Sequence, residues 1–370
     1  MRLCNMLCYT FCMKNSPQYC FFVGTRAELI KLLPVIHAFE KRNIPFTFIS
    51  SGQNELSKEL LGNTHIDIQL HEKILFPHMF WVIVWFFQTM LRGFFIINKR
   101  IKPSERGTML IHGDTISSLM GALLGRALGF KIAHIEAGLR SFNMTSPFPE
   151  EIDRFIISKL TTYHFCPNKW ACDNLKKTRG IKINTLQNTL WEQYQRASKK
   201  KIALPNSIHK PYFLFVIHRQ ENLYNKELVT SLVSEIVKQS DQLNAVFILH
   251  EPTKIALIQY NLLDTLKKNK NVILLARQDY YLFSKIIENS QCMVTDGGSN
   301  QEESYYMGKP CLILRKVTER IEGLGGNVLL SNNEPNTIHN FFDNYKKYST
   351  KPLVSWAKPS EIIVDYLQSI

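Results

Sequence analysis

The stretch TMLIHGDTISSLMGALLGRAL (108–128) begins as a short apolar run, turns at a glycine and continues as a pattern with helical spacing. Such a stretch predicts a buried strand, a tight turn and a helix. The same unit recurs at YCFFVG (19–24), KIAHIE (131–136), YFLFVIHRQEN (212–222), NAVFILH (244–250) and QCMVTDGGSNQEE (291–303). Short buried strands that alternate with helices are typical of parallel sheets covered on both faces, so the sequence predicts an α/β fold.

The repeated unit occurs in two groups, one before about residue 180 and one after about residue 210. A chain of 370 residues is also too long for one ordinary core. We therefore expect two Rossmann-like doubly wound domains, residues 1–188 and 189–354, with a C-terminal helix at about 355–370 that packs back on the first. Ligands of open parallel sheets bind beyond the carboxyl ends of the strands, so we expect the active site in the cleft between the domains.

The composition is globular and strongly basic. Hydrophobic residues make up 45% of the chain, and the formal net charge is +14. A basic chain suits a membrane surface or a phosphate-bearing small molecule, although solvated surface lysines give the same charge. The cationic residues are scattered in short runs such as SKKK and LKKNK rather than gathered in one stripe. We therefore expect no nucleic-acid partner.

The cysteines do not form a zinc signature. Cys4, Cys8, Cys12 and Cys20 crowd the first twenty residues, and no Cys-x-x-Cys pair occurs. The stretch MRLCNMLCYTFCMKN has neither the continuous apolar core nor the small-residue cleavage site of a signal peptide. We therefore expect a cytoplasmic chain in a reducing compartment.

One segment, ILFPHMFWVIVWFFQTMLRGFFIINKR (74–100), is nearly apolar enough to span a bilayer. A span is not expected, because strands 19–24 and 108–112 are predicted in one sheet and a single crossing would separate them. Two interpretations of residues 74–97 remain. The segment is either a buried or subunit-interface helix, or an apolar face lying in the membrane interface beside Arg92, Lys99, Arg100 and Lys102.

The turn DGGSNQEE (296–303) is suited to a diphosphate. Gly297, Gly298 and Ser299 lie between a predicted strand and a predicted helix, where backbone N–H groups face an anion and small residues allow close approach. Glu303, a few residues further, is well placed for sugar hydroxyls such as those of ribose. A Gly-Gly turn alone is also found at ordinary helix starts.

Two further strand ends carry cationic candidates. GTRAE (24–28) places Arg26 in the first strand-to-helix turn, with Lys31 about one helical turn beyond. The arginine offers a bidentate fork for phosphate oxygens, although a solvated loop arginine is the simpler interpretation. The turn is not the G-x-G-x-x-G of nicotinamide-binding enzymes. At IHRQEN, His218 follows another strand, where a histidine is catalytic in some proteins and structural in others.

Carboxylates crowd the segment HIEAGLRSFNMTSPFPEEIDR (134–154). Glu136 ends a predicted strand, whereas Glu150 lies in the first turn of a predicted helix, where acids also act as ordinary caps. The helix dipole keeps Glu150 ionised, and Arg154 lies one turn further on the same face. With Asp114 at a neighbouring strand end, three carboxylates are expected to converge on one small polar substrate for acid and base catalysis.

An ordered set of motifs resembles the bacterial UDP-N-acetylglucosamine 2-epimerase family. The set is FVGTRAELIKLLPV, IHGDT, HIEAGLRS, SPFPEEIDR, HRQEN, TDGGSNQEE, GKP and TERIEG, and it runs from about residue 20 to residue 330. The resemblance implies a glycosyltransferase-B type fold, a homodimer, a UDP-sugar substrate, and neither a cofactor nor a required metal. It implies elimination of UDP across C1–C2 to 2-acetamidoglucal, then re-addition to give UDP-N-acetylmannosamine for cell-surface polysaccharide synthesis.

The resemblance also implies a role for each matching position. The acid/base carboxylates are Asp114, Glu136 and Glu150. The departing diphosphate is held by Arg26 and His218, and Lys31 and Arg154 are further active-site positions. The phosphate-cradling turn is Gly297, Gly298 and Ser299, and Glu303 contacts the ribose.

The sequence departs from the family pattern at three places. The family's Ser-Gly-Gly is Gly297-Gly298-Ser299 here, its Gln-His after the second strand is Gln53-Asn54, and its Gly-Asn-Thr is Gln187-Asn188-Thr189. HGDT and HIEAGLR favour the non-hydrolysing branch. The alternatives are a hydrolysing 2-epimerase, which releases N-acetylmannosamine and UDP, and a membrane-associated glycosyltransferase of the same fold.

Overall fold

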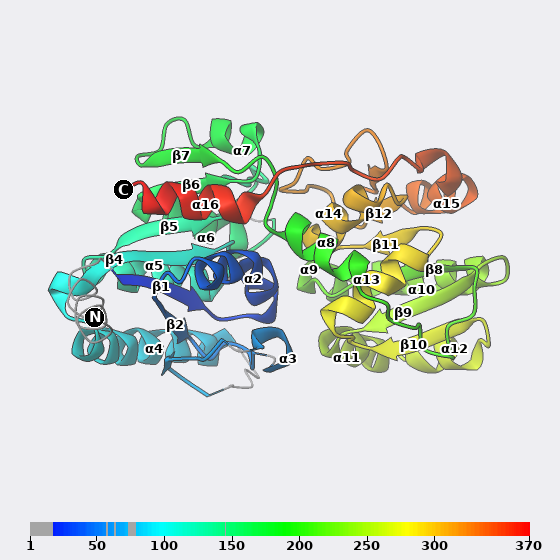
Figure 1. Ribbon diagram of the computed structural model, residues 1–370. Helices are drawn as coiled ribbons and strands as arrows, with labels where there is room; N and C mark the ends of the chain where they lie inside the picture. Colours follow the sequence, from blue (N-terminus) through cyan, green and yellow to red (C-terminus); the bar gives the residue numbers. More distant parts are fainter. Residues whose placement is uncertain (1–17, 57, 63, 73–78, 145) are drawn as a thin grey trace. The chain divides into compact units, whose positions relative to one another are not determined.

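The computed structural model describes residues 18–370 except residues 57, 63, 73–78 and 145. These residues form two compact units (Figure 1), one made of the described residues up to Gln193 together with Ala357–Ile370, the other of Tyr194–Trp356. The boundary falls inside helix α8 (Leu190–Lys199). The N-terminal Cys4, Cys8 and Cys12, and residues 74–78 of the apolar segment, lie outside the described residues.

The first unit is built on a seven-stranded sheet in the order β3-β2-β1-β4-β5-β6-β7, and all its strand pairs are parallel. Its strands are β1 (Gln18–Val23), β2 (Phe46–Ser50), β3 (Ile68–Gln69), β4 (Arg106–His112), β5 (Lys131–Ile135), β6 (Tyr163–Cys166) and β7 (Ile181–Asn184). Its helices are α2 (Arg26–Lys41), α3 (Lys58–Leu61), α4 (Met79–Arg100), η2 (Pro103–Glu105), α5 (Ile116–Ala127), α6 (Glu150–Leu160), α7 (Lys169–Asn174) and α16 (Pro359–Gln368).

Hydrophobic cores cover both faces of this sheet, because successive strand residues point to opposite sides. Phe21 and Phe48 pack with α2 and α16 on one face. Phe22 and Ile111 pack with α4, α5 and α6 on the other. The C-terminal helix α16 therefore completes the core of the first unit, where Arg42 at the end of α2 also pairs with carboxylates of α16.

The turn between β1 and α2 is fixed by its sequence. Thr25 caps the helix by accepting from the backbone nitrogen of Glu28, and the Glu28 carboxylate accepts from the nitrogens of Gly24 and Thr25. A Cβ added at Gly24 would lie 1.9 Å from Oγ of Ser117 in α5. Only glycine therefore allows the start of α5 to approach this turn.

The second unit repeats the architecture with a six-stranded parallel sheet in the order β10-β9-β8-β11-β12-β13. Its strands are β8 (Tyr212–Val216), β9 (Asn244–Leu249), β10 (Val272–Ala276), β11 (Met293–Thr295), β12 (Cys311–Ile313) and β13 (Val328–Leu330). Its helices are α9 (Gln220–Leu223), α10 (Lys226–Ser240), α11 (Glu251–Gln259), α12 (Leu263–Lys268), α13 (Tyr280–Asn289), α14 (Gly298–Met307), α15 (Pro335–Asn344) and η3 (Tyr345–Tyr348). Phe215 and Phe247 pack with α10, α11 and α15 on one face, and Val216 and Ile248 pack with α13 on the other. The prediction of two doubly wound α/β domains is confirmed.

The described part of the apolar segment forms α4, which continues to Arg100, past the predicted end at residue 97. Within the described residues, its part Trp81–Arg100 is the one helix long and apolar enough to cross a membrane, by length and composition. However, Trp85 and Ile97 lie in the core of the first unit. The strands on either side of α4 in the chain, β3 and β4, belong to the same sheet, and a crossing would separate them.

Candidate active site

In the first unit, Asp114 and Glu136 follow two neighbouring parallel strands, β4 and β5. The carboxyl ends of these strands therefore bring the two side chains to one edge of the sheet. A Cβ placed on Gly113, directly before Asp114, would lie 3.6 Å from Oε1 of Glu136. The Glu136 carboxylate therefore lies close to the turn that carries Asp114, while the convergence of Asp114, Glu136 and Glu150 on one substrate stays a prediction.

Glu136 is held in an unusual backbone conformation, with a φ of 66°. Such left-handed geometry is costly for a residue other than glycine and is concentrated at functional sites. The buried carboxylate accepts hydrogen bonds from Nζ of Lys31 at 2.8 and 3.0 Å and from the side-chain amide of Asn188. Nε2 of His112 lies 4.0 Å away. These contacts fix the position of the Glu136 carboxylate from three segments of the chain.

Arg154 links the strand-end acid to the helix start. Its guanidinium pairs with Asp114 and, at 2.7 Å, with Oε2 of Glu151. Glu151 also accepts from the backbone nitrogen of Ser141 at 3.1 Å. The predicted active-site position Arg154 is thus buried and orients Asp114.

Asp153 was not among the predicted site residues, although it lies in the acid-rich segment. Its side chain is buried, and among the described residues its Oδ2 atom has no hydrogen-bond partner. Burial, followed by the neighbouring carboxylates of Asp114 and Glu150, raises the pKa of Asp153 to about 7 against the opposing effect of Arg154. Glu150, the first residue of α6 and half-buried, therefore lies in a cluster that also includes a carboxyl group able to hold a proton at neutral pH.

Glu28 connects the two turns that carry Arg26 and Asp114. Besides capping α2, its carboxylate accepts from the hydroxyl groups of Thr115 and Ser118. Burial raises the pKa of Glu28, and these hydrogen bonds act in the opposite direction. Arg26 itself is half-buried, and its Nε donates to the backbone oxygen of Glu55 at 2.9 Å.

In the second unit, His218 lies beside a buried aspartate. Nδ1 of His218 is 3.1 Å from Oδ1 of Asp296, and the backbone nitrogens of His218 and Arg219 donate to the same carboxylate at 2.9 to 3.1 Å. Burial opposes ionisation of Asp296, but His218 and Arg219 outweigh it and lower the pKa of the carboxyl to about 2. Asp296 therefore stays charged and orients the His218 ring.

His250 is a second histidine at this edge of the sheet. Its ring stacks on that of His218, with centroids 5.1 Å apart and an angle of 20° between the planes. Burial and the neighbouring His218 lower the pKa of His250 to about 4, so this ring is neutral at physiological pH. Both histidines follow neighbouring parallel strands, β8 and β9.

The predicted phosphate turn begins helix α14, with Gly297 as its N-cap and Gly298 as its first residue. The nitrogen of Gly297 donates to Oγ1 of Thr295 at 3.1 Å. A Cβ on Gly298 would lie 2.5 Å from Oε1 of Glu319 and 2.8 Å from Nε of Arg320. A methyl group at position 298 would therefore have to displace these two side chains.

Buried ion pairs support this turn. Arg320 pairs with Glu302 at 2.8 Å, and Arg315 pairs with Glu319 at 2.7 Å. Ser299 is half-buried, whereas Glu303 is buried beside Tyr280. Burial and the Glu303 carboxylate together raise the pKa of Tyr280 well above its ordinary value. The prediction that Glu303 contacts a ribose remains untested.

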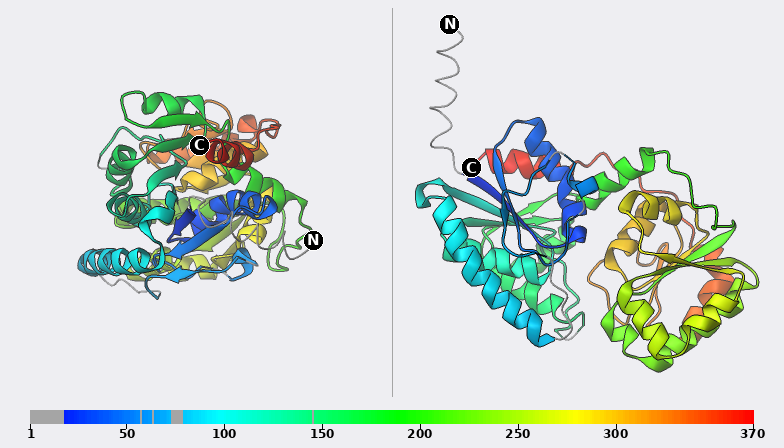
Figure 2. Two further views of the ribbon diagram at one scale, coloured as in Figure 1. Left: turned by 60° about the vertical axis from the view of Figure 1, so that its left-hand side comes forward. Right: turned by 90° about the horizontal axis from the view of Figure 1, so that it is seen from below.

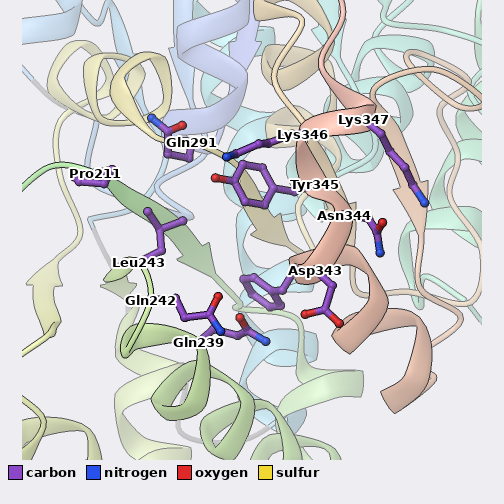
Figure 3. A pocket seen from close by; sticks show the side chains of 11 residues that line it. Pro211, Gln239, Gln242, Leu243, Gln291, Asp343, Asn344, Tyr345, Lys346 and Lys347 are labelled. Atoms are coloured by element: carbon purple, nitrogen blue, oxygen red, sulfur yellow. The ribbon is translucent and has the colours of Figure 1, made fainter.

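A cavity of about 910 Å³ lies elsewhere in the second unit (Figure 3). Pro211, Leu243 and Gln291 line it; the first two directly precede β8 and β9, and Gln291 lies two residues before the start of β11. The cavity is therefore at the amino ends of these strands, opposite the edge that carries His218. None of the predicted site residues is among its described lining.

The predicted site residues thus divide between the two units. The first contains Asp114, Glu136, Glu150, Lys31, Arg154 and Arg26, and the second contains His218, Gly297, Gly298, Ser299 and Glu303. The predicted cleft between the domains remains a prediction.

Sequence reasoning missed Asp153, Glu28 and Asn188 in the first unit and Asp296 and His250 in the second. Asp296 and His250 follow strands, so the strand-end rule that found His218 also points to them. Asn188 lies in the stretch that corresponds to the family's Gly-Asn-Thr, but its contact with Glu136 depends on the tertiary fold.

Known proteins resemble this chain along most of its length. The sequence model of a family described as UDP-N-acetylglucosamine 2-epimerase matches residues 40–359. The UDP-N-acetylglucosamine 2-epimerase of Methanocaldococcus jannaschii is 32% identical over 336 residues, which are 85% of this chain and 89% of that relative. The protein of the same name from Campylobacter jejuni is 29% identical over 331 residues, 83% of each chain.

Solved structures show the same architecture. A crystal structure of the M. jannaschii UDP-GlcNAc 2-epimerase in complex with UDP-GlcNAc and UDP has a TM-score of 0.81 and 29% identity, covering 95% of this chain and all of that one. The Neisseria meningitidis enzyme bound to UDP-GlcNAc has a TM-score of 0.81 and 26% identity, covering 96% of this chain and all of that one. These likenesses confirm the predicted glycosyltransferase-B type fold.

Proposed function

The chain belongs to the UDP-N-acetylglucosamine 2-epimerase family, and on this premise we propose that it interconverts UDP-N-acetylglucosamine and UDP-N-acetylmannosamine. The proposed route is the non-hydrolysing one. A carboxylate removes the C2 proton, the C1–O bond breaks, UDP departs and a C1=C2 double bond forms. UDP then returns to C1 while C2 receives a proton on the opposite face.

The observation that carries this proposal is the geometry of Glu136. Its buried carboxylate lies beside the turn that holds Asp114, in a left-handed backbone conformation and in contact with Lys31. Proton abstraction next to a forming double bond needs acid and base groups in distinct environments. Glu136 is paired with a lysine, Asp114 with an arginine, and Asp153 carries a raised pKa. We therefore assign Asp114, Glu136 and Glu150 to acid and base roles at C2 and C1.

The second unit supplies the groups suited to the leaving diphosphate. His218 is oriented by Asp296, and the N-terminus of α14 presents backbone N–H groups at a turn of small residues. Such a helix start stabilises negative charge on phosphate oxygens. We assign Gly297, Gly298 and Ser299 to the diphosphate and Glu303 to the ribose, with Arg26 as a further cation from the first unit. No cofactor or metal enters the proposed route.

We also propose that the product supplies cell-surface polysaccharide synthesis and that the chain assembles as a homodimer. The family resemblance supports both.

The test is incubation of the purified chain with UDP-N-acetylglucosamine in D2O, followed by proton NMR. UDP-N-acetylmannosamine with deuterium at C2 is the expected product. Free N-acetylmannosamine and UDP would instead select the hydrolysing branch. Absence of both product formation and C2 exchange would contradict an epimerase activity on this sugar.

A Glu136→Gln variant keeps the size of the side chain and removes its charge. It is expected to lose exchange at C2, whereas Glu334→Gln, a change outside the site at the N-cap of α15, is expected to leave the exchange rate unchanged. Full exchange in Glu136→Gln would remove Glu136 from the proposed acid and base groups.

A further inference from the structure

Helix α4 has two faces of different character. Its inward face is marked by Trp85, Thr89, Gly93 and Ile97, which recur every fourth residue and are buried. A Cβ on Gly93 would lie 2.8 Å from a methyl group of Leu124 in α5. The helix is therefore anchored to the first unit by close packing along one side.

The outward face of α4 is apolar. Figure 2 shows α4 on the outside of the first unit. Exposure of its large hydrophobic side chains ranges from 39% for Phe94 to 67% for Phe95. The outward set consists of Trp81, Ile83, Phe87, Leu91, Phe94 and Phe95. A row of this size is well beyond the single exposed apolar side chains that a protein surface usually carries.

Cationic side chains border this apolar face. Arg92 in the middle of α4 and Lys99 near its C-terminal end are exposed, whereas the guanidinium of Arg100 donates to the backbone oxygen of Asp67 at 2.7 Å. Lys102 follows directly and is also exposed. Between Trp81 and Arg100 the helix contains neither aspartate nor glutamate. The helix itself thus contributes large apolar side chains and only positive charge, in a chain of formal net charge +14.

We propose that this face docks the protein on an anionic lipid surface, with α4 lying in the plane of the interface. Phe87, Leu91 and Phe95 enter the boundary between headgroups and acyl chains. Arg92 and Lys99 contact lipid phosphates. This arrangement is the one that interfacial amphipathic helices use, with aromatic and aliphatic residues inserted and cations at the headgroup level.

The charges favour a lipid surface over a second copy of the chain. Two α4 faces related by a two-fold axis would bring their cations into one contact, with no carboxylate from either helix to pair with them. Anionic headgroups neutralise the same cations. A spanning orientation is also disfavoured, because the inward face would have to leave the core that it shares with α5.

Vesicle flotation with the full chain tests this docking. We use vesicles of phosphatidylcholine alone and of phosphatidylcholine mixed with phosphatidylglycerol. Wild-type protein is expected to float with the mixed vesicles, and less so as salt rises, because electrostatic attraction to the headgroups is screened. The triple variant Phe87→Ser/Leu91→Ser/Phe95→Ser is expected to lower binding by more than about tenfold. The double variant Arg92→Gln/Lys99→Gln should remove the preference for the anionic mixture.

Two controls make the result specific. Trp356→Ser removes an exposed aromatic side chain from the second unit and should bind vesicles like the wild type. Far-UV circular dichroism and epimerase turnover without vesicles check that each variant is folded. Failure of the wild type to bind mixed vesicles would overturn the proposal, as would equal binding by the triple variant. If the wild type is a dimer that binds no vesicles and the triple variant is a monomer, a second copy of the chain covers the face.

Discussion

The ammonium of Lys31 lies 2.8 Å from Oε2 of Glu136, and both side chains are almost completely shielded from solvent. The pair joins helix α2 to the end of β5, at the residue with the left-handed backbone. A buried pair of this kind depends on both partners, because removing one leaves an uncompensated charge in a medium of low polarity. The contact therefore links the stability of the first unit to the geometry of its proposed acid and base groups.

Lys31→Met tests this dependence. We expect the free energy of unfolding to fall by about 3–5 kcal/mol, because the Glu136 carboxylate is left buried without its cation. Urea unfolding followed by circular dichroism measures the loss. Lys41→Met, at the other end of α2, removes a solvent-exposed lysine 4.0 Å from Glu361 and should change stability little. Equal losses of unfolding free energy in the two variants would show that the loss does not depend on burial of the Lys31–Glu136 pair.

Asp153→Asn tests the proton held in the acid cluster. The pKa of Asp153 is raised to about 7 in the folded chain from an ordinary 3.8, so the folded state binds the extra proton between these values. The folded state is therefore destabilised as pH rises from about 4 to about 7. Asparagine cannot ionise, so the variant should be more stable than the wild type at pH 8 and similar to it at pH 4.

Thermal unfolding at several pH values measures this difference. Asp173→Asn, a surface carboxylate paired with Lys176, serves as the matched control and should track the wild type. A stability difference for Asp153→Asn that does not grow with pH would contradict a raised pKa at this position.

Gly298→Ala tests the turn that begins α14. The new methyl group would displace Glu319 and Arg320, and with them the ion pair to Glu302. We expect the KM for UDP-N-acetylglucosamine to rise by more than about tenfold, because the backbone N–H groups of the turn shift with the helix start. Steady-state kinetics measures the change.

Gly326→Ala is the control for this substitution. Its Cβ would meet only the backbone oxygen of Gly323, at an ordinary 3.4 Å. An unchanged KM in Gly298→Ala, or an equal rise in both variants, would mean that the α14 turn does not hold the substrate.

The sequence predicted the sheets and most of their strand ends because both signals are local. An apolar run followed by a polar turn marks β4 with Asp114, β5 with Glu136 and β8 with His218. Contacts between distant segments carry no such signal. The amide of Asn188 reaches Glu136 across 52 residues. Asp153 acquires its raised pKa only when α6 is buried next to Asp114.

The apolar segment shows a different limit. From composition alone, residues 74–97 could be either a buried or subunit-interface helix or a helix lying in the membrane interface. The structure divides α4 into a packed face and an exposed face, a division that follows from where α5 and the sheet lie. Periodicity indicates that two faces exist, but the packing partner decides which one is buried.

Asp296→Asn tests the support beneath His218. The pKa of Asp296 is lowered to about 2 because His218 and Arg219 outweigh the cost of burial. A lowered pKa stabilises the folded state at pH values above the ordinary 3.8, and this contribution is lost as pH falls toward 2. Wild-type protein should therefore lose stability as the pH falls from about 4 to 2. The asparagine variant should not show this pH-dependent loss, and it should be less stable than the wild type at pH 7. Turnover should also fall. The two carboxylate oxygens of Asp296 accept from the backbone nitrogens of His218 and Arg219 and from the side-chain amide of Asn222, whereas an asparagine has one acceptor oxygen for these donors. Asp264→Asn, an exposed carboxylate of α12, is the control for both readouts. If Asp296→Asn kept wild-type stability at pH 7 and full turnover, the carboxylate would be only a neighbour of His218 and not the group that orients it.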